Sequence, residues 1–121
     1  MGSLTDTRPA DLVVTAEAIR AYAAITDDFN PIHVDPDFAA TTPMKGVIAH
    51  GTMSLALIWQ MLRREFGPAR SGKASLEIRF TQPVRIGDHL RACHAPDDQG
   101  GFDVWVENQA GVAVIKGSAR L

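Results

Sequence analysis

A chain of 121 residues, 45% of them hydrophobic and 21% charged, is long enough for one domain with its own core and too short for two. Twelve Lys and Arg against fourteen Asp and Glu give a formal net charge of -2, which argues against a nucleic-acid-binding protein because such proteins gather cations against phosphates. The single cysteine, Cys93, excludes an intrachain disulfide and a Cys-x-x-Cys metal site.

Neither a signal peptide nor a membrane helix is expected. The first twelve residues lack an apolar core. The longest apolar stretch, residues 47–62, is interrupted by polar and small residues and falls short of the roughly 20 residues that cross a bilayer. No repeat or linker divides the chain. We therefore expect one domain over residues 1–121, in a cytoplasmic protein without a membrane partner.

Residues 15–41 predict two helices separated by a loop. Thr15 can cap a helix whose apolar residues recur at helical spacing and which should fray around Asp27. Residues 27–34 are expected to form a loop, because the position before Pro31 favours extended backbone. The sequence Asp-Pro-Asp at 35–37 then supplies a cap, a first-turn proline and a first-turn acid for a short helix ending near residue 41.

Residues 51–66 predict a longer helix that stops at Gly67-Pro68. Its composition leaves no fully polar face until Arg63, which is typical of a helix covered by protein on most sides. We expect it to be the central core element.

The remaining residues alternate between apolar and polar side chains, as half-buried strands do. Turn-forming residues divide them into four antiparallel strands near residues 73–83, 88–95, 101–108 and 111–120. One buried helix followed by such a meander predicts an α+β domain in which an antiparallel sheet wraps around the helix.

The densest polar cluster is the segment of residues 26–33. Its proline-fixed loop can bring the Asp28 carboxylate and the His33 imidazole together, and such a pair can hold a water molecule and move its protons. A purely structural interpretation is also open: Asp28 ends a helix, Asn30 fills the turn before the proline, and His33 lies at the surface.

A second feature lies at the start of the long helix, in the sequence Ala-His-Gly-Thr at 49–52. Free N–H groups and the positive end of the helix dipole lie there, and Gly51 lets a ligand oxygen approach the backbone. Alternatively, Gly51 only permits tight packing and His50 is a structural hydrogen-bonding residue.

These two segments resemble a known family. The run from Ile25 to Ala39, followed by Gly46 to Gly51, is similar to the MaoC-like, (R)-specific enoyl-CoA hydratases. Their motif is Ser/Thr-Gly-Asp-x-Asn-Pro-x-His, then an alanine, and later an apolar-His-Gly that opens a long helix. The resemblance is close over residues 12–66 and extends to the strands only in layout.

The resemblance implies a hot-dog fold and assigns roles to residues. The catalytic acid falls on Asp28 and the catalytic histidine on His33, while the Gly51 N–H would polarise the thioester carbonyl. Asn30 also matches the motif and is expected to shape the loop. One position departs from it: Asp27 replaces the motif glycine, which suggests a positive φ that Asp tolerates better than most residues.

The implied reaction is the reversible hydration of a trans-2-enoyl thioester, carried by CoA or by an acyl-carrier protein, to the (R)-3-hydroxyacyl thioester. No metal or redox cofactor is required. Three alternatives share the fold: an acyl-CoA thioesterase, a non-catalytic acyl-thioester-binding subunit, and a dehydratase that works on carrier-bound chains.

Two further expectations concern the substrate and the assembly. If Leu55, Trp59 and Leu62 lie on one helical face toward the sheet, the indole shortens or reshapes the acyl pocket and favours short or unusual acyl chains over long ones. Hot-dog proteins generally pair edge strands, so we expect a homodimer.

Overall fold

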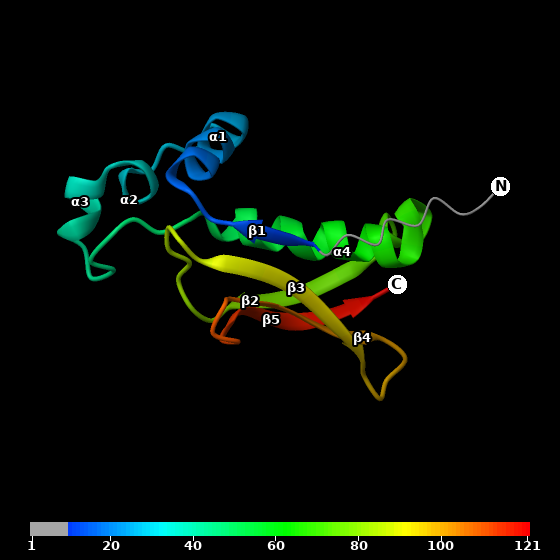
Figure 1. Ribbon diagram of the computed structural model, residues 1–121. Helices are drawn as coiled ribbons and strands as arrows, with labels where there is room; N and C mark the ends of the chain where they lie inside the picture. Colours follow the sequence, from blue (N-terminus) through cyan, green and yellow to red (C-terminus); the bar gives the residue numbers. More distant parts are fainter. Residues whose placement is uncertain (1–9) are drawn as a thin grey trace.

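The computed structural model describes residues 10–121, so most of the segment in which no signal peptide is expected lies outside the described residues. A curved antiparallel sheet packs along one side of the long helix α4 (Gly51–Ser71), and three shorter helices gather at the N-terminal end of α4 (Figure 1). This is the hot-dog arrangement that the resemblance implies. No helix within residues 10–121 combines the length and the apolar character needed to cross a membrane.

The sheet has five strands in the order β1-β3-β4-β5-β2, and all neighbours are antiparallel. The four expected strands are confirmed as β2 (Ser75–Phe80), β3 (His89–Pro96), β4 (Phe102–Glu107) and β5 (Ala113–Arg120). A fifth strand, β1 (Asp11–Val13), was not expected from the sequence and pairs with the start of β3. Three residues are too few for an alternating pattern to stand out, and tertiary pairing decides their conformation.

Helix α4 breaks where the sequence predicts. Gly67 has φ 85° and Pro68 follows it, so the long helix ends there and one further turn completes the element. Its inner face buries Met53, Leu57, Ile58, Met61 and Leu62 in the core shared with the sheet. Its outer face is exposed in the single chain, where Trp59 is 40% exposed. The expectation that protein covers the helix on most sides is therefore wrong for the single chain.

The N-terminal helices follow their caps. Thr15 caps α1 (Ala16–Thr26) by accepting from the Ala18 N–H at 3.0 Å, and Asp35 caps α3 (Pro36–Ala40). The prediction of a loop throughout residues 27–34 is wrong, because α2 (Pro31–Val34) forms one helical turn. The side chain of Asn30 accepts from the Ile32 N–H and proline occupies the first helical position, which together favour a helix start.

Candidate functional site

The loop after α1 is held in an unusual conformation that exposes Asp28. Asp27 has φ 54° and ψ 39°, which confirms the positive φ expected at this position. The Asp28 N–H donates to the Ala23 carbonyl at 3.0 Å, and the Asn30 N–H donates to the Asp28 carboxylate at 3.2 Å. The Asp28 carboxylate is 50% exposed. The strained turn thus presents a hydrated carboxylate at a fixed position beside α2.

His33 is tied to the segment that precedes α4. Its Nδ1–H donates to the Ile48 carbonyl at 2.7 Å, and the Ile48 N–H donates in turn to the Ile32 carbonyl at 3.2 Å. A carbonyl only accepts, so the neutral imidazole carries its proton on Nδ1. The Nε2 atom of His33 is therefore left with a lone pair that can take a proton from a bound water molecule.

His50 contacts both Asp28 and His33. The side chain is 3% exposed, and its Nε2–H donates to the backbone carbonyl of Asp28 at 2.9 Å. Its ring stacks on the ring of His33 with centroids 3.9 Å apart and makes a T-shaped contact with the ring of Tyr22 at a centroid distance of 5.1 Å. The hydrogen bond to Asp28 confirms the interpretation of His50 as a structural hydrogen-bonding residue. In addition, the stack fixes the plane of His33.

The side chains of Asp28, His33 and His50 converge, since one polar atom of each lies within 4.8 Å of the others. The structure thus brings together the acid and the histidine that the sequence selects. The same three residue types also bind metal ions. However, an imidazole binds a metal in its own ring plane, and the two stacked rings, inclined at 28°, direct their lone pairs along nearly parallel planes. The geometry therefore favours hydrogen bonding to a water molecule or substrate over metal ligation.

Gly51 begins α4 immediately beyond this cluster. His50 is the N-cap residue but makes no side-chain capping hydrogen bond. The Met53 N–H donates to the His50 carbonyl at 3.1 Å, while the Gly51 N–H at the very start of the helix keeps its capacity to bind an oxygen. A Cβ built on Gly51 would lie 2.8 Å from the ring of Phe80 at the end of β2. Glycine is thus needed here for close packing, as one of the sequence interpretations has it, and it also leaves the backbone accessible.

A cavity of about 320 Å³ opens beside Gly51. Asp28, His33 and His50 do not line this cavity, but Ile48, whose carbonyl accepts from His33, is part of its wall. Its walls are mainly apolar and come from the loop before α4, the end of β2 and β5: Met44, Ile48, Phe80, Val84, Val114 and Ile115. A small apolar cavity next to free backbone N–H groups suits a short acyl group.

The three residues expected to shape the acyl pocket do not line this cavity. Leu62 is fully buried in the core, Leu55 is partly buried against it, and Trp59 lies 40% exposed on the outer face of α4. Their influence on acyl length stays a prediction, which for Trp59 depends on what covers the outer face of the helix.

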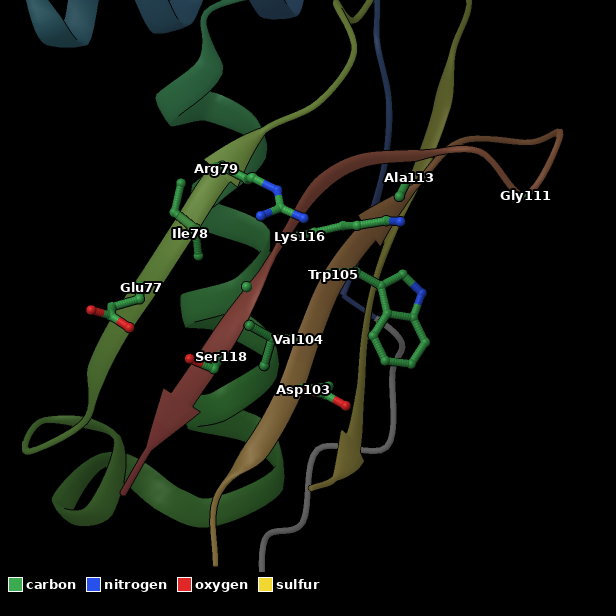
Figure 2. A pocket seen from close by; sticks show the side chains of 11 residues that line it. Glu77, Ile78, Arg79, Asp103, Val104, Trp105, Gly111, Ala113, Lys116 and Ser118 are labelled. Atoms are coloured by element: carbon green, nitrogen blue, oxygen red, sulfur yellow. The ribbon is translucent and has the colours of Figure 1, made fainter. Parts of the chain in front are cut away.

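A larger cavity, of about 700 Å³, lies on the opposite side of the sheet from α4. Figure 2 shows Arg79, Lys116 and Trp105 projecting from three neighbouring strands on the face that points away from the helix. Glu77 and Asp103 also line it, so its charges are mixed. None of the residues selected from the sequence reaches this cavity, and it does not border the Asp28 and His33 pair.

A model of the MaoC-like domain matches residues 5–116, which is most of the chain. The chain belongs to the MaoC-like domain family. An (R)-specific enoyl-CoA hydratase of Aeromonas caviae is 36% identical over 77 residues, 64% of this chain and 58% of the relative. A 3-hydroxyacyl-thioester dehydratase Z of Mycobacterium tuberculosis is 35% identical over 86 residues, 67% of this chain and 56% of the relative.

Solved structures extend the comparison to nearly the whole MaoC-like domain. An (R)-hydratase from A. caviae involved in PHA biosynthesis has a TM-score of 0.74 at 25% identity, and the alignment covers 98% of this chain and 94% of that one. The aligned part of each curated relative above is less than two thirds of its length.

Several features of this MaoC-like site were not found from the sequence. The stacking of His50 on His33, the edge contact of Tyr22 and the ring of Phe80 over Gly51 all join residues at least 17 positions apart. Contacts of this kind carry no local signal. For His50 the sequence offers its place directly before the helix N-terminus and its match to the histidine of the apolar-His-Gly motif, but neither indicates the stack on His33.

Proposed function

We propose that this MaoC-like domain catalyses the reversible hydration of a short trans-2-enoyl thioester to the (R)-3-hydroxyacyl thioester. The observation that carries the proposal is the convergence of Asp28 and His33 beside the uncapped N-terminus of α4 and its cavity. The names of the similar proteins support the reaction class, and the (R) configuration rests on that similarity.

In the proposed mechanism, the enoyl thioester carbonyl accepts a hydrogen bond from the Gly51 N–H at the positive end of α4. Negative charge that develops on this oxygen as the enolate forms is stabilised by the N–H and the helix dipole. A water molecule is held between the Asp28 carboxylate and His33 Nε2. It loses a proton to this pair as its oxygen bonds to C3, and the pair returns a proton to C2. The two residues act as one coupled unit.

This mechanism uses side chains and backbone alone, so we propose that no metal or redox cofactor takes part. CoA and an acyl-carrier protein both present the same thioester, and either carrier is compatible with the proposal. We also propose a cytoplasmic homodimer, in which a second copy pairs with β1 or β2, the two edges of the sheet in the described chain.

The test is loss of the enoyl thioester absorbance with crotonyl-CoA, for the wild type and for Asp28→Asn. Asn keeps the size of the side chain and its acceptor for the Asn30 N–H but cannot take a proton, so turnover should fall at least about 10²-fold. Urea unfolding should stay close to that of the wild type, since Asp28 is half exposed.

Wild-type hydration by the Asp28→Asn variant would refute the role of Asp28. Release of free CoA from the same substrate, measured with a thiol reagent, would instead favour the thioesterase alternative. Binding of the thioester without either reaction would favour the non-catalytic subunit.

A further inference from the structure

One residue in the wall of the cavity beside Gly51 has a buried hydroxyl group without a hydrogen-bond partner in residues 10–121. Ser54 lies in the first turn of α4, is 1% exposed, and lines the cavity together with Gly51. Its Oγ is one of three buried side-chain polar atoms without a partner in residues 10–121, and the Nδ1 atom of neighbouring His50 is another. Buried polar groups are nearly always paired, so an unpaired one that lines a ligand-sized cavity points to a group that enters with the ligand.

Nothing in the described part of the chain, residues 10–121, takes the place of that partner. A serine in a helix usually bonds the carbonyl four residues before it. For Ser54 that residue is His50, whose carbonyl accepts from the Met53 N–H at 3.1 Å and makes no bond to the hydroxyl. Thr81, which also lines the cavity, donates its hydroxyl to the Ala113 carbonyl at 2.7 Å. Gln82 lies in the lining as well but is exposed to solvent.

The place of Ser54 along the helix indicates which part of a substrate it meets. It lies three positions after Gly51, and a rise of 1.5 Å per residue places it about 4.5 Å further along the helix axis. If the thioester carbonyl lies at the Gly51 N–H and the acyl chain runs along α4 into the cavity, the Ser54 hydroxyl lies beside the acyl carbons beyond C3. A hydrocarbon there would leave the hydroxyl buried and unpaired, whereas an oxygen atom would pair with it.

We propose that Ser54 determines specificity in this site and selects short acyl thioesters that carry an oxygen atom, as a hydroxyl or keto group, beyond C3. The inference rests on the proposed hydratase function and names the substrate class within it. Binding such a group satisfies Ser54, and binding a plain alkyl chain of the same size does not. Sites built to hydrogen-bond a substrate hydroxyl reject analogues that lack it. Ser54 should discriminate between acyl groups in this cavity in the same way.

The experiment uses two pairs of substrates of matched size, each with a terminal methyl replaced by a hydroxyl. The first pair is trans-2-pentenoyl-CoA and 4-hydroxy-trans-2-butenoyl-CoA. The second is trans-2-hexenoyl-CoA and 5-hydroxy-trans-2-pentenoyl-CoA. In at least one pair, the wild type should hydrate the hydroxylated member with about tenfold or greater kcat/KM. Ser54→Ala should lose that preference through a fall of about tenfold for the hydroxylated substrate alone.

Ser71→Ala is the matched control. Ser71 is the other buried serine of α4, lies at the opposite end, and donates its hydroxyl to the Pro68 carbonyl at 3.3 Å. This variant should keep the wild-type preference and lose some thermal stability. Ser54→Ala should be as stable as the wild type or more so, because it removes a buried hydroxyl that has no partner.

Three outcomes would overturn the inference. The wild type shows no preference in either pair; Ser54→Ala lowers kcat/KM equally for both members of a pair, which would place the hydroxyl at a part common to all substrates; or the preference survives in Ser54→Ala. Any of these leaves the hydratase proposal intact as long as the wild type hydrates crotonyl-CoA. A wild type that hydrates neither crotonyl-CoA nor any of the four substrates overturns both.

Discussion

The N-termini of α1 and α4 use their free backbone N–H groups in different ways. At α1 the Thr15 hydroxyl accepts from the Ala18 N–H at 3.0 Å, which satisfies one donor of the first turn. At α4 the cap residue is His50, whose imidazole turns away to bond the Asp28 carbonyl and stack on His33. The first turn of α1 thus has a side-chain acceptor within the protein, and the first turn of α4 has none.

The same contrast holds for the shorter helices. The side chain of Asn30 accepts from the Ile32 N–H at the start of α2, and that of Asp35 accepts from the Phe38 N–H at the start of α3. Of the four helices in residues 10–121, only α4 lacks a side-chain cap. The uncapped end is also the one beside the Asp28 and His33 pair, so the missing cap is consistent with a thioester oxygen as the natural acceptor.

The largest loss of activity is expected from Gly51→Ala, a change at the uncapped start of α4. The new Cβ would lie 2.8 Å from the Phe80 ring, so either the ring or the first turn of α4 must shift. A displacement of about 1 Å at a reacting group lowers turnover by roughly 10²-fold, and we expect a fall in kcat/KM of that size with crotonyl-CoA.

The double variant Gly51→Ala with Phe80→Leu separates the two causes. A smaller side chain at position 80 makes room for the Cβ, so much of the activity should return if the clash moves the backbone. Activity equal to the wild type in the single variant would show that the position of the Gly51 N–H is unimportant. The matched change at α1, Ala16→Gly, should leave kcat/KM unchanged.

A smaller effect is expected from variants of His50. Ala removes both the hydrogen bond to the Asp28 carbonyl and the stack on His33, so kcat/KM should fall about tenfold or more. Gln can still donate an N–H near the position of Nε2 but cannot stack, so it should fall between Ala and the wild type.

The pH profile of kcat/KM distinguishes positioning from a general loss of structure. If His50 positions His33, its variants shift the shape of the profile as well as its height. A uniform reduction that follows the unfolded fraction, measured by urea unfolding, would show that His50 only stabilises the fold.

Removing the cap of α1 should act on stability alone. Thr15→Ala leaves the Ala18 N–H without its acceptor and should lower the free energy of unfolding by about 1 kcal/mol. Urea unfolding measures this change. The kcat/KM of the folded fraction should equal that of the wild type, and a loss of activity beyond the unfolded fraction would mean that the two helix starts are coupled.

The sequence predicted the parts of the fold that have local causes. Apolar alternation located four strands, Thr15 and Asp35 marked two helix starts, and Gly67 with Pro68 marked the end of the long helix. It did not locate β1, whose three residues become a strand only by pairing with β3, or the turn of α2, where the cap at Asn30 was read as part of a loop.

For the site, local sequence predicted which loop and which helix start matter but not how they meet. Asp28 and His33 are five residues apart and share a motif, so they could be selected together. The His50 stack and the Phe80 contact depend on the path of the chain between distant segments, and the missing partner of Ser54 is a property of packing. Such features follow from the tertiary structure and leave no periodic or compositional pattern.

The smallest expected effect on activity concerns Cys93, a titratable group in β3 whose thiol donates to the Glu107 carboxylate. Burial, with a hydrogen bond and charge repulsion from Glu107, raises the pKa of its thiol from 9.0 to about 11. At pH 8 the folded protein should then hold about a hundredfold less thiolate than the unfolded chain, so alkylation by iodoacetamide should be slower in that proportion. The unfolded chain loses the thiol proton at a lower pH than the folded protein does. The free energy of unfolding should therefore fall slightly as pH rises from 9 to 11. Cys93→Ser should remove that slope and keep wild-type kcat/KM.

A thiol can also be placed at the uncapped start of α4, by Thr52→Cys in the Cys93→Ser background. The pKa of this thiol should be lowered, and it should react faster than Cys93, because the positive end of the helix favours the thiolate. Equal reactivity of the two thiols would mean that the open end of α4 exerts no field that a thioester oxygen could use.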